Sequence, residues 1–202
     1  MPTLTALVPG AYERGLLCIA HAVTAAVFDR GLAAGADILT HVRIDSPLSE
    51  GNVQRMRDQG TRVSRTLVMM QVMAHARLAE RAEAAVRTAL ENVHALHEAG
   101  SPLLVGTDAN ETPFAPVPHG PSLHEEIALL GRAGVPAADA LHGAAAGVAD
   151  ALRLADRGRL ETGLRADLLL VDGDPLEDPA VLRAPRAVWI AGEHVRAGVD
   201  DG

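Results

Sequence analysis

The sequence predicts an α/β fold followed by a small all-β appendage, and three observations carry this prediction. Over the first two thirds of the chain, leucine-rich or β-branched runs alternate with patterns of helical period, as in parallel strands joined by crossover helices. Gly35, Gly60 and Gly100 stand where three of the helical patterns end. After Asp156-Arg157-Gly158 the pattern changes to short strands bounded by turn residues. We therefore expect one unit over residues 1–157 and a second over 158–202.

Each element follows from its local pattern. Four apolar runs are expected to form the strands of the first unit: 15–21, 36–42, 61–69 and 101–108. Amphipathic patterns predict helices at 24–34, 49–60, 70–98, 123–133, 137–146 and 148–154. The Pro-rich stretch 109–122 is irregular and long enough to be a functional loop. In the second unit, strands are expected at 166–175 and 186–195.

Composition limits the classes of function. The chain has 202 residues, of which 48% are hydrophobic, so it is long enough to bury a sizeable core. Its net charge of -8 would repel a phosphate backbone, and no basic stripe interleaved with aromatic residues occurs. Nucleic acid is therefore not expected as a partner.

The location of the protein is expected to be the cytoplasm, with no membrane as a partner. The single cysteine, Cys18, cannot form an internal disulfide, which suits a reducing compartment. Residues 1–10 lack the pattern of a signal peptide, and no apolar run approaches the ~20 residues that a membrane span needs.

Three polar residues stand at the carboxyl ends of successive apolar runs: His21, His41 and Asp108. In a (β/α) barrel the active-site groups project from that rim, so residues distant in sequence converge there. Two imidazoles and a carboxylate suit a divalent ion such as zinc, which would activate a bound water. The alternative is that each is structural, with the histidines hydrogen-bonded and the aspartate capping a helix.

The remaining histidines carry weaker signals. His119 lies in the Pro-rich loop after the Asp108 strand and is a candidate for substrate contact. His75, His94 and His97 fall in the long polar helical pattern, where a solvated surface is the default reading.

Several motifs resemble the metal-dependent amidohydrolase superfamily, closest to its imidazolonepropionase-like and prolidase-like branch. The likeness to the C-terminal half of that family is carried by VGTDAN, then by PHGPSLHEEIALLGRAGVPAADALHGAAAGVADALRLADRGRLETGLRADLLLVDGDPLEDP, and then by AVWIAGEHV. The earlier run GLLCIAHAVTAAVFDRGLAAGADILTH is similar to the fifth and sixth barrel strands, and PTLTALVPGAYERG to the fourth crossover helix. The resemblance implies strands 5–8 of a TIM-type (β/α)8 barrel over 1–157, with the last strands of a β-sandwich over 158–202.

The resemblance also implies roles for individual residues. His21 matches the metal-ligand histidine of the fifth strand, and His41 matches the sixth-strand histidine, which binds a second metal or the substrate. Asp108 matches the eighth-strand aspartate, a metal ligand and the general base toward the attacking water. The implied reaction is hydrolysis of an amide-like C–N bond in a small molecule, dipeptide-like or non-peptide, with a divalent metal, most simply Zn, as cofactor.

The chain departs from the family pattern at several positions. It has no His-x-His, no lysine among its 18 basic residues, and Ser64-Arg65-Thr66 in place of the seventh-strand Pro-Thr, which places Arg65 where substrate would bind. Half the barrel and up to three ligands are thus expected to be missing, as in a truncated chain. Either an active amidohydrolase is completed by self-association or by a missing N-terminal half, or the chain is a non-catalytic remnant or binding module.

Overall fold

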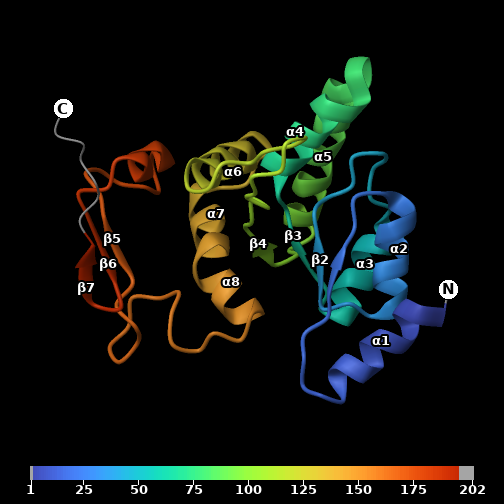
Figure 1. The fold of residues 1–202 in the computed structure, drawn as a ribbon, viewed down its shortest axis with the longest axis horizontal. Coiled ribbons are helices and arrows are strands. Elements are labelled where there is room, and N and C mark those ends of the chain that lie inside the picture. The colour runs from blue at the N-terminus through green and yellow to red at the C-terminus, as the bar shows by residue number, and fades with distance from the viewer. Residues whose placement is uncertain (1, 196–202) are drawn as a thin grey trace.

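The computed structural model describes residues 2–195 and contains two separate sheets (Figure 1). The first is a parallel sheet in the order β1-β2-β3-β4, which confirms the predicted α/β class. Its strands are short: β1 (Ile19–His21), β2 (Ile38–Thr40), β3 (Arg62–Ser64) and β4 (Leu103–Leu104). In the register of the sheet, His21 of β1 pairs with Thr40 of β2, which pairs with Ser64 of β3. The strands therefore end level with one another at one edge.

Helices cover one face of this sheet and form the main core with it. Helix α1 (Pro2–Tyr12) precedes the sheet, followed by α2 (Ala25–Ala34), α3 (Glu50–Gln59), α4 (Leu67–Leu78) and α5 (Ala82–Glu98). Leu39 and Val63, fully buried on the strands, pack in one cluster with Phe28, Met56 and residues of α4 and α5. Gly31 of α2 lies so close to the sheet that a Cβ there would meet Leu39 Cδ2 at 2.5 Å. Helix α2 therefore packs against the sheet at a distance that leaves no room for a side chain at position 31.

The expected strand 61–69 and helix 70–98 are both wrong in extent. Only Arg62–Ser64 is extended, and the apolar run from Leu67 onward starts helix α4. An apolar run of that length suits a buried strand or a buried helix equally well, so hydrophobicity alone could not decide. The long helical pattern is broken by a 3-10 turn, Ala79–Arg81, after which α5 folds back along α4 (Figure 1).

The rest of the chain forms three helices and an antiparallel sheet. The helices are α6 (Pro121–Arg132), α7 (Ala137–Ala144) and α8 (Ala146–Ala151). The sheet consists of β5 (Leu168–Leu170), β6 (Ala187–Ile190) and β7 (Glu193–Val195), with a 3-10 turn at Pro179–Arg183. It lies beyond α6–α8, at the end of the molecule opposite α1 (Figure 1). The connection 152–167 between α8 and β5 contains the predicted boundary at 157/158, which stays a prediction.

The expected single strand 186–195 is instead a tight hairpin. Ala191 and Gly192 both have positive φ, 53° and 83°, so the chain reverses between β6 and β7. The backbone N–H of Ala191 donates to Oδ1 of Asp167, which holds the turn. Alanine is an unusual residue at positive φ, so the sequence carries little turn signal there.

The other face of the parallel sheet is only partly covered. Ile38 and Leu104 pack against Ala151 and Val148 of α8, whereas Ile19 on the edge strand β1 is 50% exposed. Within residues 2–195, the helices all fall short of the length and apolar character that crossing a bilayer requires.

Candidate metal and active site

His21, His41 and Asp108 come together at the carboxyl edge of the parallel sheet. Nε2 of His41 lies 2.9 Å from Nδ1 of His21 and 4.0 Å from Oδ2 of Asp108. The two imidazole rings meet edge to face, with centroids 4.5 Å apart. His41 is buried, while His21 and Asp108 are exposed to solvent. The convergence expected from the strand-end positions is therefore present.

The cluster lines an open cavity of about 240 Å³. The sheet register sets its floor, because the backbone N–H of His41 continues the ladder by donating to the carbonyl of Ser64 (2.8 Å). Gly106 allows the close approach of the last strand, since a Cβ there would lie 2.6 Å from Ser64 Oγ. The lining residues are His21, Thr40, His41, Ser64, Thr66, Gly106 and Asp108.

Burial keeps His41 neutral. Its pKa is lowered to about 4, first by burial and then by the neighbouring His21, while Asp108 acts in the opposite direction. A neutral imidazole presents a lone pair, which is the form that binds a metal. His41 is thus ready to act as a ligand at neutral pH.

The residues of the cluster fit a divalent metal in their chemistry. Two nitrogens that bind one tetrahedral zinc at about 2.0–2.1 Å lie roughly 3.3 Å apart, close to the 2.9 Å between the facing nitrogens of His21 and His41. Asp108 stands farther away, and in the part of the chain that the structure describes no three His, Cys, Asp or Glu side chains form a complete metal-binding group. The two histidines and Asp108 are suitable ligand types for a divalent metal, but among the described residues they do not form a complete coordination site.

Arg65 lies outside this cluster. Its side chain is fully buried, and its guanidinium donates to the backbone carbonyls of Val63 and Pro102 (both 2.7 Å). A longer contact reaches the carbonyl of Ser101 (3.4 Å). These acceptors lie in the core at the β3–β4 pair, so the structure gives Arg65 a structural environment rather than contact with the cavity.

Two residues near the cluster were not identified from the sequence as site residues. Thr66 Oγ1 lies 2.6 Å from Nδ1 of His41. Glu126, fully buried in the middle of α6, accepts from the backbone N–H groups of Leu67 and Val68 at the start of α4 (both 2.8 Å). In the sequence Glu126 is only an acidic residue near the start of its own helix. Nothing in the neighbouring residues indicates that it caps a different helix, α4.

His119 is exposed on the loop before α6 and stays a candidate for substrate contact. The histidines of the long helical pattern have other surroundings. His75 is exposed and lies 3.0 Å from Glu83 Oε1, and Nδ1 of His94 lies 3.1 Å from the carbonyl of Ala133. Neither histidine lines the cavity that contains His41.

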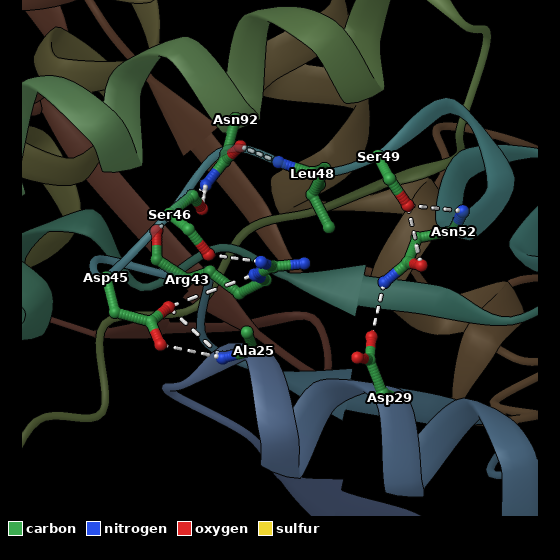
Figure 2. A network of polar contacts seen from close by, with 9 residues as sticks. All are labelled: Ala25, Asp29, Arg43, Asp45, Ser46, Leu48, Ser49, Asn52 and Asn92. Carbon is green, nitrogen blue, oxygen red and sulfur yellow. Dashed lines mark hydrogen bonds and ion pairs between the residues drawn. The ribbon is translucent and has the colours of Figure 1, made fainter.

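The loop that follows His41 is fixed by a polar network (Figure 2). The Asn92 side chain of α5 accepts from the N–H of Leu48 and donates to the carbonyls of Arg43 and Ser46. Asp45 in turn accepts from the N–H of Ala25 at the start of α2 through both carboxylate oxygens. The loop after His41 thus links the start of α2 to α5 through hydrogen bonds.

A larger cavity, about 690 Å³, lies between α7, α8 and the antiparallel sheet. Alanine, valine and leucine side chains make up most of its lining, and Arg159 at its border is paired with Asp150. Since the two histidines and Asp108 lie together at the other cavity, the smaller one is the candidate for chemistry.

Comparison with known proteins places the chain in a family. The profile described as "Amidohydrolase family" matches residues 6–195. An uncharacterized protein of Mycobacterium tuberculosis is 30% identical, with 94% of this chain and 50% of that protein covered. The chain thus spans about half the length of the curated relatives it matches.

Solved structures give the same result. A Xaa-Pro dipeptidase with methionine bound in its active site superposes with a TM-score of 0.82 at 25% identity, over 96% of this chain and 48% of that one. A Bifidobacterium longum protein assigned as a prolidase has a TM-score of 0.82 at 29% identity, over 96% of this chain and 50% of that one. With the profile covering nearly all described residues and the fold shared, the chain belongs to the amidohydrolase family.

Proposed function

We propose that this chain carries part of the active site of a metal-dependent hydrolase that cleaves an amide-type C–N bond. The observation that carries the proposal is the meeting of His21 Nδ1 and His41 Nε2 at 2.9 Å, with Asp108 nearby, at the carboxyl edge of a parallel sheet. Membership of the amidohydrolase family and the structural likeness to a Xaa-Pro dipeptidase support this reaction class. The parallel sheet is proposed to be the second half of a (β/α)8 barrel.

His21, His41 and Asp108 would have different roles in the reaction. A divalent ion, most simply zinc, would polarise the substrate carbonyl and lower the pKa of its bound water. His21 and His41 would hold the ion through their facing nitrogens. Asp108, exposed at the edge of the cavity, would take a proton from the attacking water and return it to the leaving nitrogen.

The substrate is proposed to be a small molecule, either dipeptide-like or a non-peptide amide. His119 on the loop after Asp108 would contact it, since such loops set specificity at this edge of the fold. We expect the reaction in the cytoplasm, where Cys18 would stay reduced.

The site would be completed by association, either with a second copy or with a missing N-terminal half, since this chain covers only about half the length of its curated relatives. Strand β1 is at the edge of its sheet, and its first residue, Ile19, is half exposed, so the edge suits a further strand. Sedimentation of the purified chain is expected to show a dimer or larger species, with Ile19→Asp shifting it toward monomer. A monodisperse wild-type monomer would count against self-association.

A second candidate function is a non-catalytic binding module with an amidohydrolase fold. It is favoured by the incomplete metal-binding group among the described residues and by the sequence, which has neither a lysine nor a His-x-His. In that case the cavity would bind a ligand without turning it over.

Metal content separates the two candidates. Elemental analysis of the purified 202-residue chain is expected to find about one zinc or manganese ion per chain, lost in His21→Ala and Asp108→Ala. His75→Ala, on the exposed surface of α4, is the control and should retain the ion. An absence of bound metal in the wild-type protein would reject the hydrolase proposal for this chain and favour the binding module.

A further inference from the structure

We propose that Thr66 is a positioning residue that orients His41 and stabilises the tautomer that metal binding requires. The link to metal rests on the proposed function, whereas the orientation of His41 does not. Thr66 and His41 are each 3% exposed, and Thr66 Oγ1 lies 2.6 Å from His41 Nδ1. The two ring nitrogens of His41 therefore have different neighbours, the hydroxyl on one side and His21 Nδ1 on the other.

The hydroxyl is available because another residue caps the helix. A threonine directly before a helix ordinarily accepts from an N–H of the first turn. Thr66 stands directly before α4, yet its side chain makes no such bond. The Glu126 carboxylate occupies that role, accepting from Leu67 and Val68 with one oxygen each. Because Glu126 caps α4, the Thr66 hydroxyl is free to hydrogen-bond with His41.

The backbone of Thr66 has a conformation that threonine disfavours. Its φ and ψ are 45° and 46°, in the left-handed region that β-branched residues rarely adopt. Such conformations persist where surrounding contacts determine them, and they gather at functional sites. Here the continuation of the β-ladder on one side and the capped helix α4 on the other fix the turn, which points the hydroxyl at His41.

This contact supports the form of the imidazole that metal binding needs. A metal bound through Nε2 requires the ring proton on Nδ1, and Thr66 Oγ1 can accept that proton. A hydroxyl can also donate to Nδ1, so Thr66 satisfies either tautomer. Without the hydroxyl, an N–H at Nδ1 would be buried without a partner, which raises the free energy of the metal-binding tautomer. The ring would then shift toward the proton on Nε2, where it can be donated to His21 Nδ1 and where no lone pair is left for a metal.

Three variants test the proposal. Thr66→Val keeps the shape and the β-branching but removes the hydroxyl, Thr66→Ser keeps the hydroxyl, and Thr24→Val is the matched control. Thr24 stands directly before α2, three residues after His21, and its side chain also makes no capping bond. Urea unfolding of each variant would confirm that it folds.

The first readout is the ring ¹⁵N spectrum of His41 in the metal-free chain. Thr66→Val is expected to show a smaller share of the Nδ1–H tautomer than the wild type, Thr66→Ser and Thr24→Val. Zinc affinity, measured by competition with a chelator, is expected to fall about 10–100-fold in Thr66→Val and to return in Thr66→Ser.

The two readouts fail for different reasons. A wild-type chain that binds no zinc would reject the proposed function, while the tautomer shift would still test the role of Thr66. An unchanged His41 spectrum in folded Thr66→Val would overturn the proposal, as would equal losses of zinc affinity in Thr66→Val and Thr66→Ser.

Discussion

Replacing Arg65 by methionine is expected to lower the free energy of unfolding by about 3–5 kcal/mol at pH 8. Methionine fills a similar volume, but it cannot satisfy the carbonyls of Val63 and Pro102 that the guanidinium bonds. It also removes the positive charge that favours ionised Glu126, which is fully buried and capping α4. The variant would retain a buried carboxylate without a compensating charge.

The size of this loss is expected to depend on pH, and the sign follows from Glu126. Burial raises the pKa of Glu126 to about 7, against the hydrogen bonds from Val68 and Leu67 and the charge of Arg65. At pH 8 the carboxylate is mostly ionised and needs Arg65, whereas at pH 5.5 it is protonated and does not. The destabilisation by Arg65→Met should therefore be smaller at pH 5.5.

Urea unfolding at the two pH values measures this effect. Arg62→Met, at the start of the preceding strand β3 and half-buried, is the control and should change stability by no more than about 1 kcal/mol at either pH. A destabilisation by Arg65→Met that is the same at both pH values would show that the lost carbonyl bonds alone are responsible. A loss below that of the control would contradict the structural role of Arg65.

Gly158→Ala is expected to lower the free energy of unfolding by about 3 kcal/mol or more, because two costs coincide there. Gly158 has a φ of 87°, which strains any other residue. A Cβ at this position would also lie 2.7 Å from Ala149 Cβ and 3.0 Å from the carbonyl oxygen of Ala145, on α8 and the residue before it. The connection to the antiparallel sheet passes α8 too closely for a side chain.

A substitution at Gly163 distinguishes the cost of backbone strain from the cost of steric overlap. Its φ is 92°, but a Cβ there would meet no atom within 4 Å. Gly163→Ala should therefore lose only the conformational part, about 1 kcal/mol. Thermal or urea unfolding of both variants gives the comparison, and equal losses would show that the close approach to α8 contributes nothing.

The sequence was sufficient where the deciding interactions are local. The alternation of strands and helices predicted the parallel sheet, and the strand-end positions of His21, His41 and Asp108 predicted their convergence, because carboxyl ends of parallel strands meet at one edge. The resemblance to the family's seventh strand placed Arg65 near bound substrate, and Thr66 was not identified as a site residue. The positions of Arg65 and Thr66 both depend on where β3 ends. The apolar residues that follow β3 are compatible with a strand or a helix, so the sequence does not locate that end.

The contact that decides the end of β3 comes from far along the chain. Glu126 caps α4 from 58 and 59 residues away, so no window around residues 61–69 contains that information. The reversal at Ala79 was also missed, although the contacts that hold it are nearby in the sequence. It lacks proline and glycine, and the buried contacts among Ala74, Ala82, Ala85 and Val86 hold the two helices together.

The distant cap has a consequence for the order in which the protein folds. Closing a loop of nearly sixty residues must precede full stabilisation of the first turn of α4. An intermediate with α6 undocked would retain much of the local helix and lack the fixed turn at Thr66. The geometry around His41 is therefore a late product of folding, and amide hydrogen exchange at Leu67 and Val68 should report on α6 docking rather than on helix α4 alone.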